Sequence, residues 1–381
     1  MMFRIRHLAT CIACAVALLS QPASAEIMRE VVYYGDRSVS LPPEIDRIAT
    51  NWEAQNSILT MLGYGDRIVA TTRIARSMPL MQKFVPSIKA AALTTLGDGT
   101  VNVEELMVLK PDILFSSRAL PDAVSRQLRG AGIAVASFRS NSIDALVERV
   151  LITGEMLGPD ALEVARRYQG YFDDNRRRVA ERLEGIPPDR RVRVYLASGA
   201  PLSTSGRPSL NQDWMDLGGA INIAESWFGD MPYASGIASL ENIIAGNPDV
   251  IISMNAEDAE EIRTNPQWRN VKAVREGRVY ANPRGLFWWC RETSEGALQF
   301  LWLASTLYPD ALADIDMREE TRRFYRKFYR IELTDNEIAE FLMTCPGIFP
   351  PDAIRVRPNL RTDNEANEIH GRTDHRHPGR A

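Results

Sequence analysis

One stretch of this sequence occurs twice, and the repeat limits the folds that the chain can adopt. Residues 103–116 (VEELMVLKPDILFS) align without gaps on residues 240–253 (LENIIAGNPDVIIS). Each copy predicts a short helix opened by Glu, a Pro-Asp pair that ends the helix and starts a turn, and a buried strand. Two copies indicate two structurally similar halves. The alternative is chance, since a helix followed by Pro-Asp is a common way to enter a parallel strand.

Strands and helices alternate along both halves, which predicts an α/β fold with mainly parallel sheets flanked by helices. The predicted strands are residues 47–50, 67–71, 113–116, 133–138, 192–197, 250–253 and 278–281. The predicted helices are residues 53–62, 103–109, 123–130, 212–217, 295–307, 318–329 and 335–343. We therefore expect two lobes, each with its own sheet.

The segment between the halves predicts one long rigid helix. Residues 160–184 contain no Pro and one Gly, and their apolar residues lie near helical spacing. A helix of this length would be roughly 37 Å long. We assign residues 26–157 to an N-terminal lobe, 158–186 to the connecting helix and 187–349 to a C-terminal lobe. The alternative is an ordinary long surface helix inside one domain.

The N-terminus predicts export from the cytoplasm. Arg4 and Arg6 precede an apolar run at residues 11–19, and residues 23–25 (ASA) form a cleavage signature. The apolar run is too short to cross a bilayer core of about 30 Å, so we interpret residues 1–25 as a cleaved signal peptide of a periplasmic protein. A membrane anchor is the alternative.

The C-terminus and the cysteines are less informative. Residues 350–381 are polar and rich in Pro and Arg, which predicts a disordered tail. Its His370, His375 and His377 could chelate a metal loosely, although a solvated tail is the simpler interpretation. After export, Cys290 and Cys345 could form a disulfide, but two cysteines alone do not establish one.

Composition argues against nucleic-acid binding and against an enzyme. The net charge is −4, from 45 basic and 49 acidic residues, without the basic excess typical of nucleic-acid binders. All four histidines lie in the first 25 or the last 12 residues, which argues against histidine-ligated zinc or haem and against Ser-His catalysis. Common catalytic and nucleotide-binding motifs are missing. We expect a binding protein without a cofactor or a resident metal; an exported enzyme on the same scaffold is the alternative.

Aromatic and cationic residues follow several predicted strands. Ligands of parallel sheets bind beyond the carboxyl ends of the strands, and Arg pairs well with anionic oxygens. An adjacent Trp pair cannot bury both rings on one face, so we expect one ring at a cleft. A polar loop at residues 203–206 could cradle an anion, although a plain loop is the simpler interpretation. The candidate ligand-binding residues are Trp52, Arg73, Arg118, Trp288, Trp289 and Arg291.

Several motifs, in order and spacing, resemble one family. They are residues 46–48 leading to 62–70, residues 102–112 with their second copy, and residues 307–329. Together they are similar to the periplasmic solute-binding proteins of iron-siderophore, haem and cobalamin ABC importers. The resemblance covers most of residues 26–349 and implies a monomer that delivers its ligand to an inner-membrane permease.

The resemblance also implies a ligand class and a docking surface. A metal chelate, first of all a ferric siderophore, is the expected ligand; a molybdate-type oxyanion, cobalamin or a nickel or cobalt chelate are alternatives. In this family the Glu that opens a helix in each lobe meets arginines of the permease. The matching residues are Glu104 and Glu241. Their alternative role is that of helix-capping acids without a partner.

Overall fold

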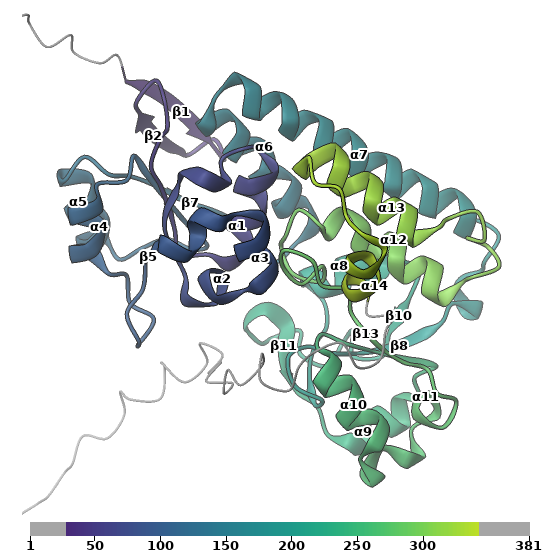
Figure 1. Cartoon of the computed structure of the whole chain (residues 1–381). Helices are drawn as coiled ribbons and strands as arrows, with labels where there is room; N and C mark the ends of the chain where they lie inside the picture. Colours follow the sequence, from purple (N-terminus) through teal and green to yellow (C-terminus); the bar gives the residue numbers. More distant parts are fainter. Residues whose placement is uncertain (1–27, 343–381) are drawn as a thin grey trace, which may run out of the picture.

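The structure is a computed structural model that describes residues 28–342 (Figure 1). The predicted signal peptide, the predicted tail and Cys345 lie outside the described residues. Cys290 is buried, and burial raises the pKa of its thiol to about 11. No helix in the described part of the chain combines the length and apolar character needed to cross a bilayer.

The N-terminal lobe is built on a five-stranded parallel sheet. The strands are β3 (Ile48–Thr50), β4 (Ile68–Thr71), β5 (Ala92–Leu93), β6 (Ile113–Ser116) and β7 (Ala134–Ser137), in the order β5-β4-β3-β6-β7. The helices are α1 (Glu53–Met61), α2 (Arg73–Ser77), α3 (Pro79–Phe84), α4 (Val103–Leu109), α5 (Asp122–Gly130) and α6 (Ile143–Leu157). An antiparallel hairpin of β1 (Arg29–Tyr33) and β2 (Arg37–Leu41) precedes the sheet.

Side chains of β6 show why both faces of this sheet are covered. Ile113 and Phe115 belong to the largest apolar core, whereas Leu114 points to the opposite face and packs with Leu106 of α4 and Leu128 of α5. Successive residues of a strand alternate between faces, and all four residues of β6 are buried. The uninterrupted apolar run is therefore explained by helices on both sides of the strand.

The C-terminal lobe repeats this plan with four parallel strands. They are β8 (Arg193–Ala197), β10 (Ile221–Asn222), β12 (Val250–Ser253) and β13 (Val279–Ala281), in the order β10-β8-β12-β13. The helices are α8 (Leu210–Leu217), α9 (Leu240–Gly246), α10 (Ala256–Thr264) and α11 (Lys272–Arg275), followed by α12 (Gly296–Leu307), α13 (Met317–Phe324) and α14 (Asp335–Phe341). A short antiparallel ribbon joins β9 (Ser203–Ser205) to β11 (Ser235–Ile237). The polar loop expected at residues 203–206 is thus largely a strand.

The sequence repeat is a structural repeat. Helices α4 and α9 each have seven residues. The side chain before each helix accepts a hydrogen bond from a backbone N–H of the first turn, Asn102 from Glu105 at 3.3 Å and Ser239 from Asn242 at 3.1 Å. The helices also end alike: Lys110 has φ 47° and ψ 60°, and Asn247 has φ 45° and ψ 59°.

An Arg–Asp arrangement extends the repeat to the neighbouring strand. Asp112 accepts the backbone N–H of Arg47 at 2.8 Å, and the Arg47 guanidinium donates to the last carbonyl of α4. Asp249 accepts the backbone N–H of Arg193 at 2.9 Å, and the Arg193 guanidinium donates to the last carbonyl of α9. The same polar contacts therefore fix the same helix in both lobes, and the prediction of two similar halves is confirmed.

The predicted connecting helix is α7 (Pro159–Leu183), which lies along the side of α12 and α13 (Figure 1). Its apolar face is buried: Phe172 packs on Phe300 of α12 at 5.2 Å between ring centroids, and Tyr171 packs on Phe324 of α13 at 5.6 Å. Asn175 donates a buried hydrogen bond to the Ala297 carbonyl at 2.9 Å. The helix is thus fixed along its length rather than free at its centre.

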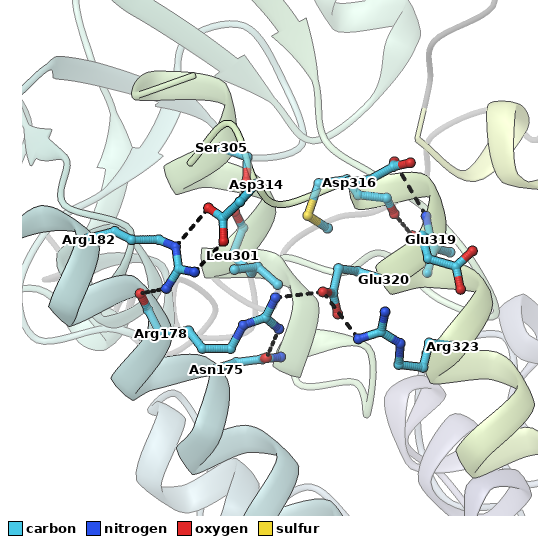
Figure 2. A network of polar contacts seen from close by, with 12 residues as sticks. Asn175, Arg178, Arg182, Leu301, Ser305, Asp314, Asp316, Glu319, Glu320 and Arg323 are labelled. Carbon is cyan, nitrogen blue, oxygen red and sulfur yellow. Dashed lines mark hydrogen bonds and ion pairs between the residues drawn. The ribbon is translucent and has the colours of Figure 1, made fainter. Parts of the chain in front are cut away.

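Charged contacts between the C-terminal half of α7 and the segment around α13 are drawn in Figure 2. Arg178 donates to Glu320 of α13 at 2.6 Å, and the Glu320 side chain is only 5% exposed. Arg323 lies 3.6 Å from the same carboxylate. Arg182 pairs with the exposed Asp314. The buried Glu320 carboxylate therefore links the C-terminal half of α7 to α13.

Arg178→Ala is expected to lower the free energy of unfolding by about 3 kcal/mol, because it leaves the buried Glu320 carboxylate poorly compensated. Arg177→Ala is the matched control on the same helix. It removes exposed pairs with Asp174 and Glu181 and should cost less than about 1 kcal/mol. Urea unfolding of both variants measures the difference, and equal losses would contradict the role given to Glu320.

Candidate functional site

Two candidate arginines of the N-terminal lobe follow the carboxyl ends of parallel strands. Arg73 follows β4 and is exposed at the start of α2, whose N-cap Thr72 accepts the Ala75 N–H at 3.3 Å. Arg118 follows β6 and is exposed; its carbonyl accepts the Ser116 hydroxyl at 2.8 Å. Since β4 and β6 flank β3 in one parallel sheet, both residues lie at the same sheet edge.

Trp52 is a core residue in the structure rather than a ligand surface. It is 7% exposed, and the guanidinium carbon of Arg149 lies 3.6 Å from its ring centroid. Burial lowers the pKa of Arg149 to about 10, so this side chain remains a cation at neutral pH and makes a cation–π contact with the ring. The ligand-binding interpretation of Trp52 is corrected for this reason.

The remaining candidates lie on one segment of the C-terminal lobe. We call residues 283–294, between β13 and α12, the binding loop. Trp289 is fully buried, and its Nε1–H has no hydrogen-bond partner among residues 28–342. Trp288 is half-buried, with the Arg284 guanidinium carbon 4.2 Å from its ring centroid. Of the pair, Trp288 is thus partly exposed, and Trp289 is corrected to a core residue.

The two arginines of the binding loop are half-buried. Arg291 Nη2 lies 2.9 Å from the thioether sulfur of Met254, which follows β12. Burial lowers the pKa of Arg284, while the charges of Glu257 and Glu340 act in the opposite direction. A thioether is a weak acceptor, so the Arg291 guanidinium has donor capacity that a ligand could use.

Sequence reasoning did not identify Glu295, the residue that directly follows the binding loop. Its carboxylate is fully buried and accepts hydrogen bonds from the Leu286 N–H at 2.7 Å, the Phe287 N–H at 3.3 Å, the Thr293 hydroxyl at 2.8 Å and the Tyr325 hydroxyl. Removal from water raises the pKa of Glu295 to about 7, because these hydrogen bonds offset only part of the desolvation. In the sequence, an acid just before a long apolar helix is typical of an ordinary helix N-terminus. Nothing in the pattern indicates that its side chain is buried.

The end of the binding loop contacts the N-terminal lobe. The Thr293 hydroxyl lies 2.6 Å from the Ser57 hydroxyl of α1, and the Ser294 N–H donates to the same Ser57 oxygen at 3.3 Å. The Arg149 guanidinium donates to the Glu292 carbonyl. The loop that carries Trp288 and Arg291 is therefore tied to both lobes.

The two candidate docking acids occupy equivalent exposed positions. Glu104 and Glu241 are each the second residue of their helix. One turn later each helix presents an apolar side chain, Met107 at 38% exposure and Ile244 at 37%. Residues three apart share a helix face, so each lobe shows an acid beside an exposed apolar group.

A hollow of about 310 Å³ lies elsewhere on the C-terminal lobe. It is lined by Ala200–Ser203, Ile237, Leu240, Glu261, Asn265, Gln267 and Trp268. None of the candidate ligand residues lines it, although Leu240 directly precedes Glu241. Among residues 28–342, no group of three or more His, Cys, Asp or Glu side chains is arranged to hold a metal ion.

Comparisons with known proteins agree with this architecture. A family profile described as "Periplasmic binding protein" matches residues 48–284. The molybdate-binding protein MolA of Haemophilus influenzae is 27% identical over 351 residues, which cover 84% of this chain and 95% of MolA. The ABC transporter substrate-binding lipoprotein YvrC of Bacillus subtilis is 24% identical over 289 residues, 73% of this chain and 85% of YvrC. A solved periplasmic solute binding protein from Veillonella parvula superposes with a TM-score of 0.73 at 25% identity, covering 83% of this chain and 97% of that one.

Stability should fall between pH 5 and pH 8 because of Glu295. The folded protein holds this proton more tightly than the unfolded chain, so the contribution is fully present below about pH 4.5 and is lost as the pH rises through about 7. The free energy of unfolding should fall by about 3 kcal/mol over this range, because a shift of one pKa unit corresponds to about 1.36 kcal/mol. Urea unfolding at several pH values should show a flatter profile for Glu295→Gln than for the wild type.

Glu163→Gln, at an exposed position on α7, is the control and should follow the wild-type profile. If the profile of Glu295→Gln had the wild-type slope, another group would be responsible for the pH dependence.

Proposed function

The chain belongs to the periplasmic binding protein family, and we propose that it captures an anionic metal compound outside the cytoplasm for an ABC importer. Relatives in this family are substrate-binding proteins of transport systems rather than enzymes. The proposed ligand site combines Arg73 and Arg118 of the N-terminal lobe with Trp288 and Arg291 of the binding loop.

The observation that carries this proposal is the state of Arg291. Its guanidinium is half-buried, and within residues 28–342 its side chain has the Met254 sulfur as hydrogen-bond partner and no carboxylate within ion-pair distance. Arg73 likewise has no ion-pair partner in the described part of the chain. Taking a cation partly out of water is unfavourable unless it is paired, so an anionic ligand would supply the counter-charge for Arg291.

Molybdate is the anion to test first. The relative MolA is named for molybdate binding and aligns along nearly its whole length. A small doubly charged oxyanion can accept hydrogen bonds from several guanidinium groups at once. This ranks the oxyanion above the ferric siderophore that the resemblance alone favoured.

A ferric siderophore is retained as a second ligand because of Trp288. Its ring is half-buried beside Arg284 and follows the end of β13. A catecholate ring of such a chelate can stack on the Trp288 ring while the negative charge of the chelate pairs with an arginine. An oxyanion has no ring that could stack there.

Docking to the permease is assigned to Glu104 and Glu241. Their equivalent places in the structural repeat fit a permease with two copies of one complementary site. A carboxylate–guanidinium contact would supply the directional part of the binding. Met107 and Ile244, one turn further on, would add apolar contact area at each of the two points.

Arg291→Ala is expected to weaken ligand binding about 30-fold or more, since truncation of a desolvated arginine costs about 2–5 kcal/mol. Titration calorimetry with molybdate, and with a ferric catecholate as the second probe, measures the loss. Arg118→Ala should weaken binding in the same direction.

Arg269→Ala, which removes an exposed arginine near the hollow instead of the binding loop, should bind like the wild type. Wild-type affinity in both Arg118→Ala and Arg291→Ala would rule out the arginine site, and binding of neither probe by the wild type would rule out the proposed ligands.

The double variant Glu104→Ala, Glu241→Ala is expected to abolish uptake while ligand binding in solution stays normal. Uptake of labelled ligand by cells and calorimetry of the purified protein separate the two steps. The double variant Glu163→Ala, Glu181→Ala removes two exposed acids of α7 and should transport normally. Wild-type uptake by the first variant would disprove the docking assignment without affecting the receptor role.

A further inference from the structure

One carboxylate holds both ends of the binding loop. At the start of the loop Glu295 accepts the N–H groups of Leu286 and Phe287, and at the end it accepts the Thr293 hydroxyl. The intervening residues include Trp288 and Arg291. The conformation of this stretch is thus set by contacts to a side chain that itself precedes α12, a regular and buried helix.

The packing around Glu295 is tight. Tyr325, fully buried, donates its hydroxyl to the carboxylate, and burial together with the neighbouring acid raises the pKa of Tyr325, which keeps the hydroxyl protonated. A Cβ added at Gly285 would collide with both the Glu295 carboxylate and the Tyr325 hydroxyl. The start of the loop is therefore fitted to this acid–tyrosine pair and cannot shift toward it.

Two fully buried side chains near Trp288 restrict the position of its backbone. Leu286 and Trp289 are both 0% exposed and belong to the main core. Trp288 lies between these core residues in sequence and remains half-buried. Its orientation depends on the backbone of Leu286 and Phe287, which is the backbone that Glu295 binds.

The same carboxylate is linked to the N-terminal lobe. Thr293 donates to Glu295 and is also in contact with Ser57 of α1, which is buried. Helix α1 begins directly after β3, the central strand of the five-stranded sheet. A chain of hydrogen bonds thus runs from the binding loop through Glu295 and Thr293 to the opposite lobe.

From these contacts we propose that Glu295 is a positioning residue for ligand capture: it holds the binding loop so that Trp288 and Arg291 face the ligand in a fixed relation to the N-terminal lobe. This inference rests on the proposed function, since it takes the binding loop as the ligand site. Glu295 itself does not touch the ligand. Its effect is preorganisation, because side chains already held in place lose less freedom when the ligand binds.

Glu295→Gln tests the proposal, because the amide can accept the hydrogen bonds at only one of its two ends. Hydrogen exchange followed by mass spectrometry should show roughly tenfold faster exchange in residues 283–294 and little change elsewhere. Molybdate should bind about tenfold more weakly, since two side chains must be ordered anew. Both measurements are made well below the melting temperature of the variant.

Glu320→Gln is the matched control. It changes another buried carboxylate of the same lobe, which pairs with Arg178 and lies outside the binding loop. This variant should lose stability while keeping wild-type exchange in residues 283–294 and wild-type affinity for molybdate. If both variants lost affinity in proportion to their loss of stability, the role of Glu295 would be structural only. That result would overturn the proposal.

Tyr325→Phe covers the case in which Glu295→Gln does not fold. It keeps the carboxylate and removes one donor, so exchange and affinity should change in the same direction by a smaller factor. Wild-type values for exchange or affinity in the folded variants would overturn the positioning role. If the wild type bound no molybdate, the proposed ligand would fail, and the exchange measurement would still decide whether Glu295 holds the loop.

Discussion

A single apolar core crosses from one lobe to the other, and the relation between the lobes depends on it. The core includes β3 and β6 of the N-terminal sheet, β8 and β12 of the C-terminal sheet, and the apolar sides of α7 and α12. Aromatic side chains of α7 that are buried against α12 and α13 fix this helix to the C-terminal lobe, since exposing each ring would lose a large hydrophobic contribution. The lobes are thus held like parts of one folded unit, although each has its own sheet and its own copy of the repeat.

A shared core has consequences for both proposed activities. The arginines of the proposed site, which come from different lobes, would then keep their spacing in the absence of ligand, which favours binding by a preformed site over binding by closure of an open one. The exposed acids of α4 and α9 keep their spacing as well. Under the proposed docking role, a permease with two complementary points would therefore recognise the distance between Glu104 and Glu241 as well as their charge.

Patterns carried by neighbouring residues were readable from the sequence, and contacts between distant residues were not. The alternation of strands and helices, the repeat and the α7 helix follow from local periodicity and from Pro and Gly positions. The sequence analysis did not identify the β1–β2 hairpin or helix α6. It also named Trp52 and Trp289 as ligand-binding candidates without detecting their burial, because that burial depends on partners far along the chain, such as Arg149 for Trp52. The same limit applies to Glu295, whose donors include Tyr325 from a later segment.

The hydrogen bonds of Glu295 explain why a carboxylate occupies this buried position. An apolar residue of similar size would avoid the desolvation of a charge, and such replacements often stabilise proteins. It could not, however, accept these hydrogen bonds. The Leu286 N–H and the Thr293 hydroxyl would keep the hydroxyls of Tyr325 and Ser57 as neighbours, but the Phe287 N–H would lose its acceptor. The binding loop has too few internal backbone contacts to satisfy these groups by itself. A conformation that leaves Trp288 partly exposed while burying its neighbours Leu286 and Trp289 therefore draws on an acceptor from outside the loop, and the acid that precedes α12 provides it.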